Sequence, residues 1–247
     1  MERVKKHTAF HIHTYRCKHA GIEKEKAYIE KAMELGIEEI VFTDHCPFPG
    51  NPFRYRMNLS ELQDYASTLQ ELKQKYVDQI DIRIGLETEY IPTYQEYYEE
   101  LKDSGNYDLL LLGQHFVLLP EGIYNFESKD KFYEPEHLAE GMIQGMESGL
   151  FSVVAHPDLI FRRRKVWDAE TEQIANRIKA SVARTGVVLE KNIDSMVTTW
   201  NNKKKREYWP EFWAELPDGV RTIYGLDAHS TADLERNYKV QLALEGF

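Results

Sequence analysis

Short runs of apolar, mostly β-branched residues alternate along the chain with segments whose apolar residues recur at helical spacing. The runs predict strands at Ala9–His13, Glu39–Asp44, Ile80–Glu87, Leu109–His115, Ser152–His156, Val187–Glu190 and Thr222–Asp227. The other segments predict helices at Ile22–Leu35, Leu59–Val77, Tyr94–Leu101, Pro135–Glu147, Ala169–Arg184 and Asn201–Leu216. Such alternation is typical of βαβ units around a parallel sheet. We therefore predict an α/β fold, a closed seven-stranded barrel that forms a single domain over residues 1–247.

Charge and cysteine content narrow the possible partners. The chain has 31 Lys and Arg against 41 Asp and Glu, a formal net charge of −10. This acidic surplus argues against broad binding to nucleic acid or to an anionic membrane, because both require basic surface. The longest unbroken apolar run, Leu109–Leu112, is far below the ~20 residues of a membrane helix. Cys17 and Cys46 cannot form a disulfide framework, so we expect a soluble, cytoplasmic protein.

Histidines gather at one end of the predicted strands. Of the nine histidines, seven lie at or just after the carboxyl end of a predicted strand, where α/β barrels build their active sites. Carboxylates share this placement, among them Glu87, Glu89, Asp158 and Asp227. Each residue alone is most simply a hydrogen-bonded structural group, but their common placement predicts a metal site. The candidate ligands are His11, His13, His19, His45, Glu87, His115, His156, Asp227 and His229.

These candidates exceed the needs of one ion. On a regular strand the i, i+2 pair His11 and His13 points to one face and can chelate an ion. A divalent ion bound through nitrogen and oxygen takes about four to six ligands, some of them water. The residues therefore predict two or three ions that share a bridging carboxylate, and Glu87, after an apolar strand, is the expected bridge. Imidazole with carboxylate suits Zn, Mn or Fe.

The order of these residues resembles the motifs of the polymerase and histidinol phosphatase (PHP) superfamily. The matching segments are His11-Ile-His13 with His19, Thr43-Asp44-His45, Gly85-Leu86-Glu87 with Tyr90-Ile-Pro92, Gly113-Gln-His115, Ala155-His156-Pro-Asp158 and Gly225-Leu-Asp227-Ala-His229. They span nearly the whole chain, and within the superfamily the match is to single-domain histidinol-phosphate phosphatases. Two segments depart from the family pattern: E-I-N-T reads Glu190-Lys191-Asn192-Ile193, and G-S-D reads Gly225-Leu226-Asp227.

This resemblance implies a distorted seven-stranded TIM-like barrel that holds three divalent transition-metal ions. By position, the first ion is held by His11, His13, Glu87 and Asp227, the second by Glu87, His115 and His156, and the third by His19, His45 and His229. The resemblance also implies that Arg162, six residues after His156, binds the phosphate of the substrate.

The implied activity is phosphomonoester hydrolysis, with L-histidinol phosphate converted to L-histidinol and phosphate in histidine biosynthesis. We expect a hydroxide bridging two ions to attack phosphorus while Arg162 clamps the phosphoryl oxygens. Asp44 is a candidate acid for the leaving oxygen. The partner is thus a small-molecule phosphate ester.

Other functions stay open at this point. The same fold could act on a nucleotide, a sugar phosphate or phosphotyrosine, or as a 3′–5′ exonuclease, which the acidic charge disfavours. A non-catalytic metal-binding module would hold ligands without a phosphate clamp. An amidohydrolase also begins with H-x-H on a barrel strand, but it usually carries a lysine after a middle strand and fits the triple-metal pattern less well.

Overall fold

The chain falls into two compact units. The structure is a computed structural model and describes residues 7–120, 122–125, 135–202 and 204–246. Unit 1 comprises Met1–Glu87, Ser104–Leu109 and Tyr224–Phe247, and unit 2 comprises Thr88–Asp103 and Leu110–Ile223. The strands of the main sheet follow chain order, β1-β2-β3-β4-β7-β8-β9. The predicted single domain stays a prediction, and each unit is described by itself.

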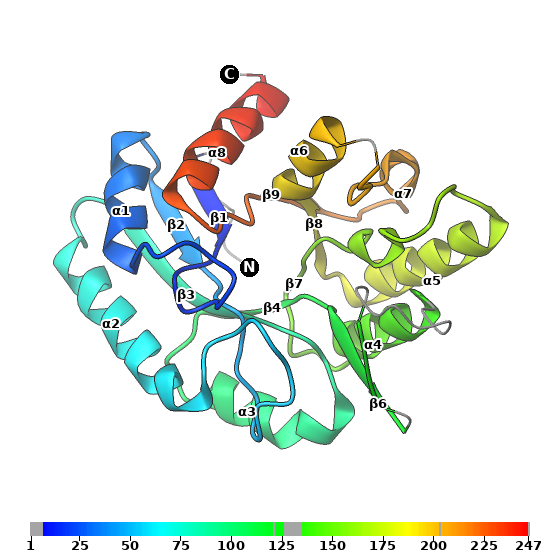
Figure 1. Cartoon of the computed structure of the whole chain (residues 1–247), viewed down its shortest axis with the longest axis horizontal. Helices are drawn as coiled ribbons and strands as arrows, with labels where there is room; N and C mark the ends of the chain where they lie inside the picture. The colour runs from blue at the N-terminus through cyan, green and yellow to red at the C-terminus, as the bar shows by residue number, and fades with distance from the viewer. Residues whose placement is uncertain (1–6, 121, 126–134, 203, 247) are drawn as a thin grey trace. The chain divides into compact units, whose positions relative to one another are not determined.

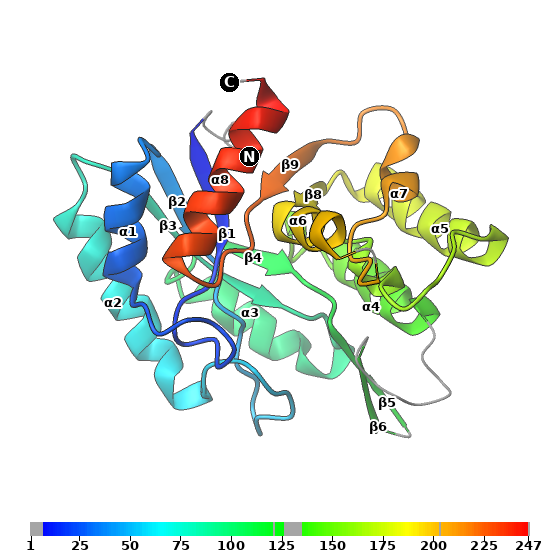
Figure 2. The same cartoon turned by 45° about the horizontal axis from the view of Figure 1, so that its top comes forward.

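Unit 1 is built on three parallel strands with helices packed against them. Its elements are β1 (Thr8–Ile12), α1 (Glu25–Glu34), β2 (Glu39–Phe42), a 3-10 turn (Leu59–Glu61), α2 (Leu62–Lys75), β3 (Asp81–Thr88, ending at the unit boundary) and α8 (Thr231–Glu245). β1 pairs with β2, and β2 with β3, in parallel register. Helix α8 packs against both α1 and β1 (Figures 1 and 2). Ile29 of α1, Phe42 of β2 and Leu69 of α2 are fully buried in its core.

The strand β1 is irregular at a predicted ligand. The register between β1 and β2 shifts between Phe10 and Ile12, and His11 has a left-handed backbone with φ 71°. An extra residue of this kind changes the direction in which a side chain leaves the strand. The alternation of side chains between the two faces of a regular strand is therefore interrupted at His11, within the His11 and His13 pair.

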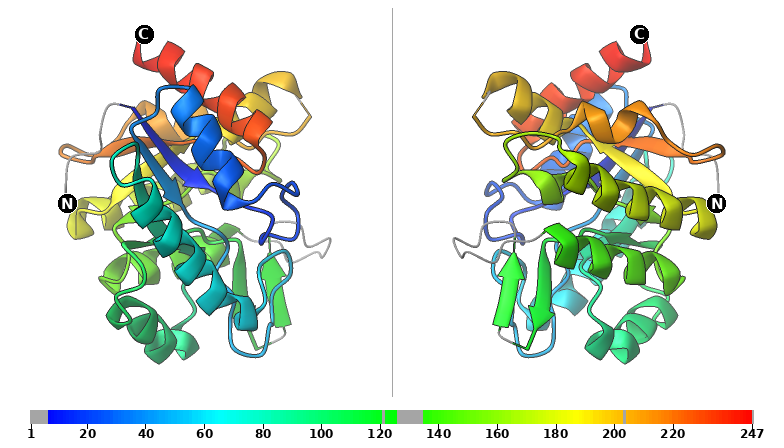
Figure 3. Two further views of the ribbon diagram at one scale, coloured as in Figure 1. Left: turned by 90° about the vertical axis from the view of Figure 1, so that its left-hand side faces the viewer. Right: turned by 90° about the vertical axis from the view of Figure 1, so that its right-hand side faces the viewer.

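Unit 2 contains parallel strands, a hairpin and two long packed helices. Its elements are a 3-10 turn (Pro92–Tyr94), α3 (Gln95–Asp103), β4 (Leu109–Leu112), β5 (Phe116–Leu119), β6 (Gly122–Asn125), α4 (Pro135–Glu147), β7 (Val153–Val154), a 3-10 turn (Leu159–Phe161), α5 (Ala169–Thr185), β8 (Val188–Asn192), α6 (Ile193–Asn201), α7 (Pro210–Ala214) and β9 (Thr222–Gly225, crossing the boundary). β7 lies between β4 and β8, parallel to both. Helices α4 and α5 pack side by side (Figure 3). Leu111, Val154 and Leu189 are buried on these strands.

Local signals explain where the best-predicted helix lies. Helix α5 begins after Asp168, whose carboxylate accepts a hydrogen bond from the backbone N–H of Thr171 (2.9 Å). It ends at Gly186, which has φ 71°, a conformation that glycine adopts at little cost. The predicted span Ala169–Arg184 is therefore confirmed to within one residue.

Several predicted elements are wrong or too long. The helix predicted over Asn201–Leu216 does not form: α6 ends at Asn201, and the separate α7 begins at Pro210, because proline cannot continue a helix but fits its first turn. The strands predicted as Leu109–His115 and Ser152–His156 end at Leu112 and Val154. The hairpin β5–β6 and helices α6 and α8 were outside the prediction.

The helices of the described residues are all too short or too polar to cross a membrane.

Candidate metal centre

Backbone hydrogen bonds bring the carboxyl ends of the strands of unit 1 together. The N–H of Glu87 donates to the carbonyl of Asp44 (3.2 Å), and the N–H of His13 donates to the carbonyl of Ala228 (2.9 Å). A parallel bridge also joins His45 to Glu87. The ends of β1, β2 and β3 thus lie beside the segment that follows β9, and residues far apart in the sequence meet there.

Four ligand atoms of unit 1 have the spacing of a metal site. Nε2 of His11 lies 3.3 Å from Oε2 of Glu87 and 3.7 Å from Oδ1 of Asp227. Nε2 of His13 lies 3.4 Å from each of the same two oxygens. Four atoms arranged tetrahedrally at about 2.0–2.2 Å from an ion stand about 3.3–3.6 Å apart. Ordinary N–H···O hydrogen bonds are shorter, about 2.7–3.2 Å, so these imidazole-to-carboxylate distances fit ligands of a divalent cation.

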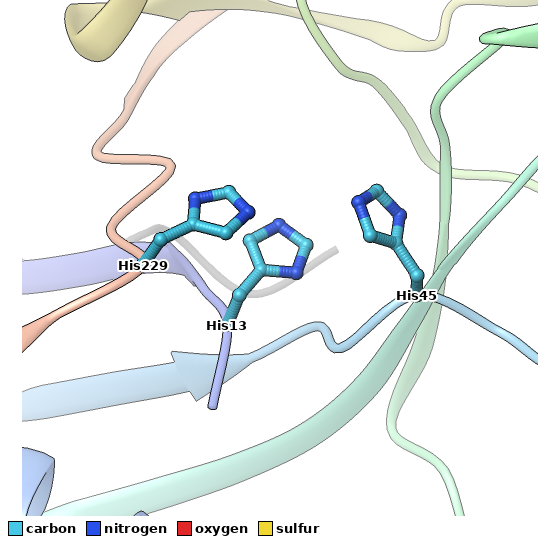
Figure 4. Close-up of side chains that lie close together, drawn as sticks. All are labelled: His13, His45 and His229. Carbon is cyan, nitrogen blue, oxygen red and sulfur yellow. The ribbon is translucent and has the colours of Figure 1, made fainter. Parts of the chain in front are cut away.

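Three imidazoles form a second group beside it. The ligand atoms of His13, His45 and His229 all lie within 4.8 Å of one another, and Figure 4 shows their rings gathered from three separate segments. The ring of His19 lies 4.6 Å from that of His229 and 5.2 Å from that of His45, between centroids. The residues predicted for the third ion are therefore brought together. Nδ1 of His45 also lies 3.0 Å from Oε2 of Glu87, a contact that the sequence did not predict.

Hydrogen bonds at Nδ1 fix the orientation of two of these rings. Nδ1 of His19 lies 3.1 Å from the carbonyl oxygen of Tyr55, and Nδ1 of His229 lies 3.1 Å from that of Asp227. A carbonyl only accepts hydrogen bonds, so Nδ1 carries the ring proton in both residues. Each Nε2 then keeps its lone pair, as metal-binding histidines do. The buried Nε2 of His229 makes no hydrogen bond to any residue that the structure describes.

Burial and neighbouring charges set the protonation of the first ligand set. Burial is the largest cause that lowers the pKa of His13 to about 3, and a proton on the neighbouring His229 would lower it further. Burial alone would raise the pKa of Asp227, but His11, His13 and His229 together hold it well below its usual value. At neutral pH the set therefore offers a neutral imidazole and an ionised carboxylate, the forms that bind a cation.

Backbone strain coincides with three of the predicted ligands. His11 (φ 71°), His156 (φ 29°) and Asp227 (φ 49°) have left-handed backbones. For a residue other than glycine, such a conformation costs about 1–3 kcal/mol and persists where the surrounding structure enforces it. Residues of this kind cluster at active sites and ligand clamps, and these three all come from the predicted ligand set.

Unit 2 brings together the two predicted ligands that it contains. The rings of His115 and His156 are 4.9 Å apart between centroids. Nδ1 of His115 lies 3.0 Å from Oε1 of Glu89, a fully buried carboxylate. A carboxylate that accepts the Nδ1 proton directs Nε2 toward a metal and raises its basicity. Glu89 is therefore the orienting partner of His115.

The predicted phosphate clamp lies in an ion pair of unit 2. Nη2 of Arg162 contacts Oε1 of Glu207 at 2.7 Å, and that oxygen also lies 3.0 Å from Nζ of Lys205. The side chain of Arg162 is 17% exposed. Arg163 is exposed, as predicted, whereas Arg164 pairs with Glu170. Arg162 thus has one edge of its guanidinium fixed by a carboxylate, and its phosphate-binding role stays a prediction.

Asp44, the predicted acid, is buried among hydrogen-bond donors. Its Oδ1 accepts from the N–H and the hydroxyl of Thr14 (2.9 Å each) and from the thiol of Cys17 (3.3 Å). Burial raises the pKa of Asp44 to about 6, against the opposing effect of these bonds. Oδ2 makes no hydrogen bond within the described part of the chain. A proton would therefore reside on Oδ2, and the catalytic role of Asp44 stays a prediction.

Sequence reasoning missed the groups that orient the ligands. Tyr55 acts through its backbone carbonyl, 36 residues from His19, and no side-chain pattern signals such a contact. Glu207 pairs with Arg162 across a long sequence separation. Cys17 had a usable signal, because it falls between His13 and His19 in the first motif, but a buried cysteine usually acts only as a small apolar packing residue.

Comparison with known proteins shows the family of this chain. The model of the PHP domain family matches residues 9–193. The chain belongs to the PHP domain family. The probable histidinol-phosphatase of Deinococcus radiodurans is 27% identical over 238 residues, 91% of this chain and 86% of that protein. The probable histidinol-phosphatase of Schizosaccharomyces pombe is 32% identical over 252 residues, 90% of this chain and 80% of that protein.

A solved structure extends the likeness of this PHP domain to the fold. The histidinol phosphate phosphatase of Lactococcus lactis, complexed with Zn, L-histidinol and phosphate, superposes with a TM-score of 0.71 at 19% identity. The match covers 98% of this chain and 94% of that one. The predicted fold class, a seven-stranded TIM-like α/β barrel, is thereby confirmed, as is the family predicted from the motifs.

Proposed function

We propose that this PHP domain is a metal-dependent phosphomonoester hydrolase that converts L-histidinol phosphate and water to L-histidinol and phosphate. The observation that carries the proposal is the four-residue ligand set of His11, His13, Glu87 and Asp227, with imidazole-to-carboxylate separations of 3.3–3.7 Å. Histidinol-phosphatases among the relatives, similar over about nine-tenths of the chain, support this substrate. The zinc, L-histidinol and phosphate bound by the Lactococcus lactis enzyme support both the metal and the substrate.

Three ions are the proposed cofactor, with zinc, manganese or iron as the metal. Unit 1 offers His11, His13, Glu87 and Asp227 for one ion, and His19, His45 and His229 for another. Unit 2 brings His115 and His156 together, and we assign them to the remaining ion. Divalent ions lower the pKa of bound water and neutralise charge on phosphoryl oxygens.

The residues of the chain supply binding, orientation and charge. Glu87 places one negative oxygen within 3.0–3.4 Å of three imidazole nitrogens, which offsets the repulsion between neighbouring cations. Arg162 would form paired hydrogen bonds to phosphoryl oxygens, whose charge spreads as the ester bond breaks. Asp44 would hold a proton at Oδ2 for the leaving oxygen, since Oδ1 already accepts three hydrogen bonds.

The metal content tests the ligand assignment directly. We expect protein purified without chelators and dialysed against metal-free buffer to retain close to three equivalents of transition metal, because nine ligands exceed the needs of one ion. Elemental analysis by mass spectrometry measures this number. A reproducible ceiling of one equivalent in active protein contradicts the three-ion proposal.

The substrate is tested with a panel of phosphate esters. We expect kcat/KM for L-histidinol phosphate to exceed that for a nucleotide, a sugar phosphate or phosphotyrosine by about 100-fold or more, a difference of about 2.7 kcal/mol in transition-state binding. Phosphate release from protein of defined metal content measures the rates. Preference for another ester overturns the substrate, degradation of an oligonucleotide indicates an exonuclease, and hydrolysis of no ester indicates a binding module.

A further inference from the structure

The thiol of Cys17 contacts two candidate metal ligands, His13 and His45, and the carboxylate of Asp44. Cys17 is fully buried. Its Sγ lies 3.3 Å from Nδ1 of His13, 3.3 Å from Oδ1 of Asp44 and 3.1 Å from the backbone nitrogen of His45. The mechanism proposed above uses His13 and His45 but gives Cys17 no role.

The direction of each hydrogen bond follows from what each atom can donate. Oδ1 of Asp44 accepts from both Thr14 donors and has no proton to give, so its contact with Sγ is made through the single thiol proton of Cys17. The backbone N–H of His45 can only donate, and Sγ accepts from it. Sγ then faces Nδ1 of His13 with lone pairs alone, and Nδ1 must carry the ring proton of His13.

The opposite ring nitrogen of His13 faces the cation set. Nε2 of His13 lies 3.4 Å from both Glu87 Oε2 and Asp227 Oδ1, whereas Sγ of Cys17 contacts Nδ1. The two nitrogens of an imidazole point to different sides of the ring, so Cys17 does not share the ion held by Nε2. Sulfur here behaves as an orienting group, although His13, Cys17 and Asp44 lie close enough to form a ligand triad.

We propose that Cys17 is a positioning residue: anchored by Asp44, its thiol holds His13 in the tautomer that presents Nε2 to the metal and fixes the backbone of His45. Partners of this kind restrict ring rotation before the ion arrives, and their loss typically costs 10–100-fold in metal affinity. The hydrogen bonds that join Thr14, Asp44 and Cys17 thus connect His13 and His45, which follow different strands. This inference rests on the proposed metal site and not on the identity of the substrate.

The second cysteine provides a matched control. Cys46 is also fully buried and follows His45 directly, but its thiol donates to the carbonyl of Pro47 (3.3 Å). Cys17→Ala and Cys46→Ala remove the same atom from equally buried positions. Similar losses of folding stability are expected from both, so an effect confined to Cys17 reflects the orientation of the ligands.

Zinc affinity of the full-length protein, measured by competition with a chromophoric chelator, tests the proposal. We expect Cys17→Ala to bind the tightest zinc ion about 10–100-fold more weakly, and Cys46→Ala to bind it within about twofold of the parent. Cys17→Ser should fall between them, because its hydroxyl can donate and accept but lies farther from its partners. Equal affinity in the parent and Cys17→Ala overturns the proposal.

A second measurement avoids substitution at Cys17. Long-range ¹H–¹⁵N correlation spectra of the zinc-loaded protein, with His13 assigned by comparison with His13→Asn, report which ring nitrogen is protonated. We expect a protonated Nδ1 and a zinc-bound Nε2; the reverse assignment refutes the proposal even if Cys17→Ala does not fold. Failure of the parent to bind zinc would instead contradict the proposed function, so the two failures are distinguishable.

Discussion

Glu87→Gln is expected to remove metal from at least two positions and to lower kcat by about three orders of magnitude or more. Oε2 of Glu87 lies 3.3 Å from His11 Nε2, 3.4 Å from His13 Nε2 and 3.0 Å from His45 Nδ1. Glutamine keeps the size of the side chain but removes the charge that holds two cations close together. A loss of this magnitude corresponds to about 4 kcal/mol of transition-state stabilisation.

Glu39→Gln is the matched control for this change. Glu39 is also a buried carboxylate of unit 1, but it lies at the first residue of β2 and accepts a hydrogen bond from the hydroxyl of Thr8 (3.2 Å). Its neutralisation should leave metal content and turnover unchanged. Metal content comes from elemental analysis and kcat from phosphate release at saturating substrate. Full metal content with normal turnover in Glu87→Gln would falsify the ligand assignment.

The strands were predictable because each contains a continuous apolar run. The residues at which they end were not predictable. Leu109–Leu112 and Val153–Val154 form strands, but the predictions ran on to His115 and His156. The chain leaves the sheet before these histidines, and His156 has a left-handed backbone. Apolar periodicity carries no information about such conformations, which the contacts of the folded chain enforce.

Helices were predicted where an amphipathic pattern and an end signal coincide, as at Gly186 after α5. Helix α8 mixes charged and apolar residues on several faces, and its buried positions include Asn237 beside Leu234 and Tyr238. Its amino-terminal cap, Ser230 accepting from the N–H of Asp233 (3.0 Å), is visible in the sequence as a local signal. Without a clear apolar stripe, that signal alone did not predict a helix.

The gathering of the candidate ligands was predictable, but the contacts that orient them were not. Histidine and carboxylate pairs at strand ends are a local pattern, and the structure places seven of the nine candidates in one cluster of unit 1. The groups that fix ring orientation are a backbone carbonyl (Tyr55), a thiol (Cys17) and a carboxylate (Glu89). Their contacts depend on how the loops fold, which sequence spacing does not specify.

Arg162→Ala is expected to leave metal content unchanged and to lower kcat/KM for L-histidinol phosphate by about 10- to 1000-fold. This range corresponds to about 1.4–4 kcal/mol, reasonable for a charge-assisted clamp in a partly desolvated site. Inhibition by inorganic phosphate should weaken in parallel, because the same guanidinium would bind the product. Arg163 is exposed, and Arg163→Ala should cost less than about twofold.

Arg162→Ala also breaks the ion pair with Glu207, and this effect on the rate must be separated from the loss of phosphate binding. In Arg162→Ala the carboxylate of Glu207 loses the guanidinium that lies 2.7 Å away in the parent and keeps its contact with Lys205. Its less balanced charge would then repel phosphate. The double variant Arg162→Ala/Glu207→Gln removes that charge. If Arg162 binds phosphate, the double variant stays as slow as Arg162→Ala; recovery to the parent rate would show that Arg162 serves only to neutralise Glu207. A rate unaffected in all of these variants would mean that phosphate is held without Arg162.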